Sequence, residues 1–403
     1  MKGKHTSERT APAWCIDICA RWMQSRTLNV VESNPSSIAV YRDPYHSLRK
    51  TSQLFENNPK FASCVRRIVF DGYYGAATNA MIFDILRRCN NIVYLTVPWT
   101  ALRYGDEDDW SRLLGRNEER RSIASLELLA VDLKQSQMDN AANQVDKKPL
   151  ISTKLDFSGL KRLKIFGNSN FMPLTDEDLV AISHTAVNLR EIHVTGTASV
   201  TIDGIGALAD SSDATLEILE HSPLSADGFA HPDPTSLLGR KEHLCPKVLS
   251  CPRLRNLSLS LPSLCEKLFS DPTVNWTGEI QIRTTTVCGR HSLSLKFTSE
   301  AQAQFWRILD QARWLMSSRE RDGVELHIEI FVENLIFEPR KSLVHGNFDM
   351  AEVLSNGTWP AKRLQSSKGP YGQTGLYGKV EGPYECVSER TFREGLERHY
   401  ISI

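Results

Sequence analysis

Residues 174–214 read LTDEDLVAISHTAVNLREIHVTGTASVTIDGIGALADSSDA and contain one pattern twice. Leu174 and Val200 lie 26 residues apart, and each begins an apolar-Thr step that leads into an amphipathic helix pattern. An acidic residue comes after each step, and we expect it to cap the helix. The apolar helix positions also match, with Leu179 and Ile182 in the first copy and Ile205 and Leu208 in the second. Two helix–strand units in the same register indicate a repeat architecture.

An apolar triplet at positions i, i+3 and i+5 recurs on both sides of this segment. Its copies are Val65-Ile68-Phe70, Ile92-Leu95-Val97, Ile123-Leu126-Leu128, Leu160-Leu163-Ile165, Leu189-Ile192-Val194 and Leu254-Leu257-Leu259. A degraded copy has Leu216 and Leu219 but places His221 at the third position. Because 41% of the chain is hydrophobic, such triplets also arise by chance, so the helices between them carry the inference.

Two polar stretches interrupt the spacing, QSQMDNAANQVDKKP and ADGFAHPDPTSLLGRKEH, and we interpret both as insertions. The copy that begins at Leu160 adds Asn168 at i+8. An inward amide at that position can bond the backbone of the turn that leaves the strand.

This pattern resembles the cysteine-containing leucine-rich repeat, with its Cys-x-x-Leu-x-x-Leu-x-Leu strand and its T-D-x-x-L-x-x-L helix. Cys89 and Cys251 stand three residues before Ile92 and Leu254, where that subtype has its cysteine. The segment HSLRKTSQLFENNPKFASCVRRIVFDG is similar to the region directly after the F-box in fungal F-box/leucine-rich-repeat proteins. The resemblance covers roughly residues 45–265 and is strongest over residues 155–262.

The resemblance implies an α/β fold, a leucine-rich-repeat solenoid whose curved parallel sheet carries helices on its convex side. It also implies a protein-binding function like that of the substrate receptors of Skp–cullin–F-box ubiquitin ligases. In such a receptor the repeats hold the target and the N-terminal segment holds the Skp adaptor. The F-box itself is missing or degenerate here, since residues 1–44 offer only CIDICARWMQ, which is similar to its last helix. The alternative is a repeat scaffold or interaction protein without F-box activity.

This interpretation divides the chain into four segments. Residues 1–44 form a helical N-terminal segment, residues 45–265 the repeat array, residues 266–340 an atypical strand–helix–strand continuation or cap, and residues 341–403 a loop-rich tail with a short helix. Alternating residues predict strands at Ile280-Ile282, Leu293-Leu295-Phe297 and Val324-Leu326-Ile328-Ile330. Between the last two, residues 299–322 predict an amphipathic helix with one apolar face, made of Phe305, Ile308, Leu309, Ala312 and Leu315. A solenoid needs such a cap to cover its last open edge.

The charge balance and the cysteine content limit the classes of partner that we expect. Lys and Arg total 48, as do Asp and Glu, so the formal net charge of zero provides no general attraction to nucleic acid or to an anionic membrane. No secretory leader and no apolar run of membrane-spanning length occurs. The nine cysteines are scattered and odd in number, which suits reduced thiols and a cytoplasmic or nuclear location. We therefore expect protein partners, and neither nucleic acid nor membrane.

Motifs that could carry chemistry have simpler interpretations. The G-x-G-x-x-A string of residues 204–209 fits a helix start inside a repeat better than a nucleotide loop. His243, Cys245 and Cys251 lie close together but lack the paired spacing of a metal site. The acidic run of residues 106–109 suits a solvated loop or a helix cap, with a docking role as the alternative, and Cys15 and Cys19 suit buried thiols. Only His291 and His327, near expected strands, would support an enzyme. We expect no cofactor, no metal and no catalytic residues.

The open side of the strands is the expected binding surface. Because side chains alternate along a strand, the triplet residues at i+3 and i+5 point into the core while i+2, i+4 and i+6 point outward. The outward residues mix aromatic, basic and small polar groups, as protein interfaces do. The candidate protein-binding residues on this concave wall are Arg67, Asp71, Tyr94, Thr96, Glu127, Arg162, Lys164, Phe166, Glu191, His193, Asn256 and Ser258.

Overall fold

The computed structural model divides into two compact units, Met1–Ala186 and Val187–Ile403. The structure describes residues 46–70, 76–115, 123–129, 147–169, 174–197, 200–222, 245, 248, 250–261, 263–271, 273–284, 286–287, 299–332, 335–346, 348–350, 362–364 and 384–402. Several expectations fall outside them: the N-terminal segment 1–44, Asp71, the strand expected at residues 293–297, His243, His291 and nearly all of the two insertions. The side chain of Asn168 is also not described.

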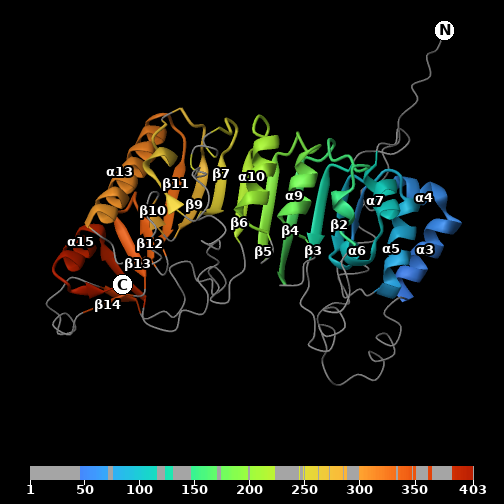
Figure 1. Cartoon of the computed structure of the whole chain (residues 1–403), viewed down its shortest axis with the longest axis horizontal. Helices are drawn as coiled ribbons and strands as arrows, with labels where there is room; N and C mark the ends of the chain where they lie inside the picture. The colour runs from blue at the N-terminus through green and yellow to red at the C-terminus, as the bar shows by residue number, and fades with distance from the viewer. Residues whose placement is uncertain are drawn as a thin grey trace, which may run out of the picture. The chain divides into compact units, whose positions relative to one another are not determined.

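The first unit contains a parallel sheet (Figure 1). Its strands in spatial order are β1 (Arg67–Val69), β2 (Tyr94–Pro98), β3 (Ser125–Leu129) and β4 (Arg162–Ser169). Its helices are α3 (His46–Asn57), α4 (Pro59–Cys64), α5 (Ala76–Arg88), α6 (Thr100–Tyr104), α7 (Glu107–Leu114) and α9 (Asp176–Ser183), with a 3-10 turn at Pro149–Ile151. Helical segments thus lie between successive strands, as the crossover connections of parallel pairing require.

The second unit begins with strands that pair in parallel and ends with strands that pair antiparallel. The parallel strands are β5 (Glu191–Thr197), β6 (Ile218–Ser222), β7 (Asn256–Ser260), β9 (Gly278–Thr284) and β11 (Leu326–Val332). The antiparallel strands continue from β11 in the order β12 (Leu335–Glu338), β13 (Leu343–Gly346), β16 (Tyr384–Ser388) and β15 (Lys362–Leu364). Two short pairs join β8 (Ser263–Leu264) to β10 (Thr286–Val287) and β14 (Asp349–Met350) to β17 (Ile401–Ser402). The helices are α10 (Ile202–Ser211), α13 (Ser299–Arg321) and α15 (Glu389–Glu397), with a 3-10 turn at Glu266–Leu268.

The apolar triplets form the core, as the pattern predicts. Every residue of the six triplets is at most 5% exposed, and Leu163, Ile165 and Val194 are fully buried. In the degraded copy His221 occupies the inward third position and is also fully buried. The alternation of strand side chains therefore separates an apolar inner side from a polar outer side in both units.

Helix starts differ in detail from the expectation. Thr175, rather than the acidic residue after it, is the N-cap of α9, and Asp178 completes a capping box with the Thr175 backbone. Thr201 is the N-cap of α10, and its hydroxyl accepts a hydrogen bond from the Asp203 amide. A threonine hydroxyl satisfies the first free amides from a non-helical position, so the acidic residue is left to favour the helix dipole.

Two of the ambiguous motifs are now placed. Gly204 and Gly206 lie inside α10 and not in a loop before a helix, which excludes the phosphate-binding geometry considered for that string. The acidic run of residues 106–109 begins α7, where the Asp106 carboxylate accepts a hydrogen bond from the Asp109 amide. The run therefore contains a helix cap.

The segment after residue 265 also contains its expected helix. All five residues expected on the apolar face of α13 are buried, from Phe305 to Leu315. Gly323, at φ +74°, ends this helix in the left-handed conformation that glycine adopts without a steric penalty.

Residues 341–403 contain the expected short helix, α15, but also strands that the expected loop-rich tail did not include. Residues 341–403 include β13 and β16, which extend the sheet of the second unit, and α15 covers them with Phe392. Phe305, Trp306, Phe337, Phe348 and Phe392 pack as one aromatic cluster from α13, β12, the chain just after β13 and α15. Long-range aromatic packing, which no local pattern reports, makes this segment part of the fold.

Candidate protein-binding surface

The outward side chains of β1 to β4 form what we call the first strand face. Strand register aligns them in rows, so that Arg67, Tyr94, Ser125 and Arg162 lie side by side, followed by Val69, Thr96, Glu127 and Lys164. A third row contains Pro98, Leu129 and Phe166. Equivalent positions in successive strands thus bring together residues that are some thirty positions apart in the chain.

Glu127 is the polar centre of this face. Its carboxylate accepts a hydrogen bond of 2.9 Å from the Thr96 hydroxyl and lies 3.4 Å from the Arg162 guanidinium. The Glu127 side chain is 17% exposed, whereas Thr96 is only 6% exposed. Thr96 therefore differs from the expectation of an open contact residue: its hydroxyl orients Glu127 from below the surface.

Aromatic and basic groups project around this centre. Tyr94 is 52% exposed, so about half of its side chain is open to a partner. The Lys164 ammonium lies 4.4 Å from the centroid of the Phe166 ring, a cation–π distance. Arg67 is exposed on β1, in the same row as Tyr94. The sequence alternation placed these four residues on the same side of the sheet as the structure does.

The outward side chains of β5, β6, β7, β9 and β11 form the second strand face. One row runs through His193, Glu220, Ser258, Gln281 and Glu329, and the row beside it contains Glu191, Ile218, Asn256, Glu279 and His327. Sequence reasoning predicted Glu191, His193, Asn256 and Ser258 but missed Glu220, Glu279, Gln281, His327 and Glu329. The same alternation around Ile280, Ile282 and Ile328 would have found the residues of β9 and β11.

Two histidines of the second strand face contact carboxylates. His193 Nδ1 lies 2.8 Å from a Glu220 carboxylate oxygen, and its Nε2 lies 3.5 Å from Glu191. His327 Nε2 lies 3.0 Å from Glu329, whose other oxygen accepts a 3.2 Å hydrogen bond from the Gln281 amide. The hydrogen bond to Glu329 raises the pKa of His327 above its usual value, against the opposing effect of burial. These contacts orient the histidine and glutamate side chains, and the carboxylates give this face negative charge.

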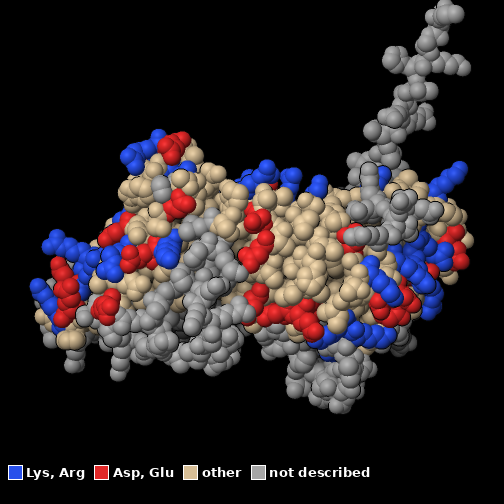
Figure 2. Space-filling view, turned by 45° about the horizontal axis from the view of Figure 1, so that its top comes forward, with Lys and Arg blue, Asp and Glu red and all other residues tan. Residues whose placement is uncertain are grey.

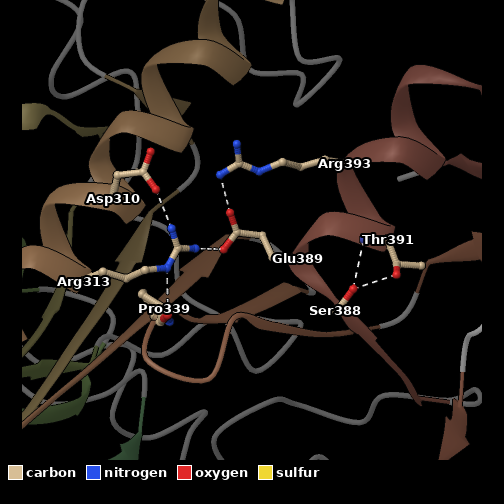
Figure 3. A network of polar contacts seen from close by, with 7 residues as sticks. All are labelled: Asp310, Arg313, Pro339, Ser388, Glu389, Thr391 and Arg393. Carbon is tan, nitrogen blue, oxygen red and sulfur yellow. Dashed lines mark hydrogen bonds and ion pairs between the residues drawn. The ribbon is translucent and has the colours of Figure 1, made fainter.

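A separate polar network joins α13 to α15 (Figure 3). Arg313 donates to Asp310 and Glu389, and its Nε donates to the Pro339 carbonyl over 2.9 Å. Arg393 also donates to Glu389, which is only 5% exposed. Burial lowers the pKa of both arginines, yet each keeps a carboxylate partner.

This network lines a surface pocket of about 520 Å³. Arg313 and Arg393 each donate to the Glu389 carboxylate, and Arg390 donates to Glu394 over 3.1 Å. We therefore interpret the network as a structural clamp between the two helices.

The described part of the chain offers no cluster of metal ligands. Those residues contain no group of three or more His, Cys, Asp or Glu side chains that could hold a metal ion. Burial raises the pKa of Cys251 to about 11, so its thiol is protonated and packs as a small apolar group. Among the helices of the described residues, none is long and apolar enough to cross a bilayer.

The visible surface carries both signs of charge. Figure 2 shows Lys and Arg side chains interspersed with Asp and Glu, and broad areas that have neither. Charges of both signs are expected for a chain of zero net charge, and their local balance can still differ from one part of the surface to another.

Comparison with known proteins identifies no family for this arrangement. A scan of the chain against models of protein families matches none, and a search of curated proteins finds no similar sequence. What the chain shows is a mixed α/β fold with a mostly parallel sheet and two chemically different strand faces.

Proposed function

We propose that the chain is a leucine-rich-repeat protein that works by binding another protein on its strand faces. The observation that carries this proposal is the repeat register. The same inward triplet, the same outward rows and threonine-capped helices recur along parallel strands. Repeats of this kind build extended surfaces from equivalent strand positions.

The first strand face has the composition of a binding surface. Tyrosine and arginine are over-represented among residues that dominate binding energy, and Tyr94, Arg67 and Arg162 lie in one row. Because these side chains stand on strands, a partner would meet a surface that is largely organised in advance.

Within this proposal the chain resembles substrate receptors of Skp–cullin–F-box ubiquitin ligases, with residues 1–44 as the segment that would contact the Skp adaptor. The alternative is a repeat scaffold without a ligase. A pull-down with purified Skp adaptor distinguishes them, using the full chain beside a version that lacks residues 1–44. The receptor predicts binding that is lost on truncation. Absence of binding by both versions supports the scaffold.

A site-specific cross-linking experiment tests the binding surface itself. A photo-activated benzophenone amino acid replaces Tyr94, and a control variant carries it at Val180 of α9, which is 40% exposed on a helix. We expect defined protein adducts from position 94 and none of the same adducts from position 180. Equal adduct patterns from the two positions would contradict a binding role for the first strand face.

A further inference from the structure

The two strand faces carry opposite charge. Among the described outward positions, the first strand face has three cations, Arg67, Arg162 and Lys164, and one carboxylate, Glu127. The second strand face instead has the carboxylates Glu191, Glu220, Glu279 and Glu329, with Arg283 as its cation. In a chain of zero net charge, the positive character of the first face is therefore local.

The cations of the first strand face are only partly neutralised. Arg162 lies 3.4 Å from Glu127, the carboxylate of that face. Among the described residues the Arg67 side chain has no ion pair, and Lys164 contacts the ring of Phe166 but no carboxylate. Two positive groups are thus free to meet an anionic partner. Their charge attracts such a partner over a range of about 8–10 Å at ordinary salt.

Geometry sets the length of that partner. Arg67 on β1 and Lys164 on β4 are three strand spacings of about 4.8 Å and two residues of about 3.3 Å apart, roughly 16 Å in all. An extended segment that crosses the strands would cover this distance with about four to five residues. Tyr94, 52% exposed, lies on β2 between the two cations and can pack against apolar side chains between the charges, while Phe166 lies beside Lys164 on β4.

We propose that the first strand face docks an acidic, Asp- and Glu-rich segment of a partner protein. Arg67 and Lys164 pair with carboxylates at the two ends of the segment, and Tyr94 packs against its middle. Thr96 and Arg162 hold Glu127 between them, so this carboxylate does not repel the segment as a free charge would. The inference rests on the proposed protein-binding function and adds the chemistry of the target.

The test measures binding of short fluorescent peptides to the full chain by anisotropy. The probe has two acidic residues at each end and three uncharged residues, including leucine, between them, and the control peptide has lysine in place of every acid. We expect the acidic probe to bind at least about tenfold more tightly than the lysine peptide, with an affinity that falls as salt is raised.

Charge reversal then locates the site. The double variant Arg67→Glu/Lys164→Glu should weaken binding of the acidic probe about tenfold or more, and Arg67→Lys should retain most of it. Lys50→Glu, an equal change for one exposed residue of α3, is the control and should leave binding unchanged. Circular dichroism and the melting temperature confirm that each variant is folded.

Several results would overturn the proposal. These are equal binding of both peptides, binding that the double variant does not weaken, and single-stranded RNA that binds as tightly with the same sensitivity. A double variant that converts an oligomer into a monomer, without any peptide binding, would identify a second copy of the chain as the occupant. The cross-link at Tyr94 separates the two proposals. If position 94 forms adducts but the acidic probe binds no more tightly than the lysine peptide, the proposed function stands and only this inference fails. If position 94 forms no adducts, both fail.

Discussion

The hydroxyl of Thr96 donates a hydrogen bond of 2.9 Å to the carboxylate of Glu127, across neighbouring strands. Both residues occupy position i+4 of their repeats, and strand register pairs their Cα atoms. A contact between equivalent positions requires that β2 and β3 align without a one-residue slip, which would move every side chain to the other side of the sheet. The bond is thus a local sign of the repeat register on which the proposed binding surface depends.

Replacing the buried Leu163 with alanine should destabilise the chain by about 2–5 kcal/mol, because the change leaves a cavity in a closely packed core. Urea denaturation measures the loss. The neighbouring Lys164→Ala is the control, since this outward residue should change the free energy of unfolding by less than about 0.5 kcal/mol. A loss under that size for Leu163→Ala would contradict its inward position.

Replacing Glu389 with glutamine should destabilise the second unit by about 1–3 kcal/mol, because Arg313 and Arg393 would both lose the buried carboxylate that they share. Denaturation of the full chain measures the effect. The control is Glu394→Gln, whose partner Arg390 is 89% exposed, so that a change of about 0–1 kcal/mol is expected. Similar losses in both variants would show that the network of Figure 3 is not a structural clamp.

Acid should weaken the second unit partly through Glu338. Ion pairs with His345 and Lys341 lower the pKa of this carboxyl to about 2 from an ordinary 4.5, with the His345 contact the largest cause. A depressed folded-state pKa contributes stability above pH 4.5 that is lost as the pH falls toward 2. The stability difference between the wild-type chain and Glu338→Gln should therefore shrink over that window by on the order of 2 kcal/mol. A difference that is constant from pH 6 to pH 2.5 would contradict the shifted pKa.

His327 should titrate above its ordinary pKa because its ring bonds to Glu329. A raised folded-state pKa contributes stability that is fully present below about pH 6.5 and is lost as the pH rises through the folded value. Proton NMR of the imidazole follows the titration, and Glu329→Gln should return the pKa toward its ordinary value. Glu320→Gln, on the exposed side of α13, is the matched control. If neither variant moves the titration, Glu329 is not the cause.

Removing the threonine cap of α9 with Thr175→Ala should cost about 0.5–2 kcal/mol, because it removes the N-cap hydroxyl from the capping box that Thr175 forms with Asp178. Thr175→Ser should retain most of the stability, since it keeps the hydroxyl. Thr153→Ala changes an exposed turn residue and should have little effect. Thermal unfolding compares the melting temperatures of the three variants. Equal melting temperatures for Thr175→Ala and Thr153→Ala would rule out the cap.

Local patterns were sufficient for the repeating part of the chain. The triplets, the alternation of the outward rows and the helix α13 all follow from periods of 2 and 3.6 residues. The same alternation placed Tyr94, Lys164 and His193 on the outward side. The accessibility of an outward residue is different, since Thr96 is buried by neighbours that its own strand does not contain.

The strand pairing and long-range packing of the C-terminal part could not be predicted in this way, although its short helix α15 was expected. The expected tail joins the sheet through β13 and β16, which are separated by a long stretch of sequence but pair antiparallel. Arg313 meets Glu389 across 76 residues, and the aromatic cluster gathers side chains from four parts of the chain. Such contacts depend on how distant segments pack, and no periodicity in either segment encodes its partner.

The sequence by itself determined which side of each strand is apolar, that helices occur at α9 and α10, and that parallel strands alternate with helices. It could do so because burial of apolar side chains acts on each segment separately, at the period of its own backbone. Only the tertiary structure decided that cations gather on the first strand face and carboxylates on the second. Polar rows form only when separate strands align, because a charge acquires its neighbours from the register between strands and not from its position in the chain.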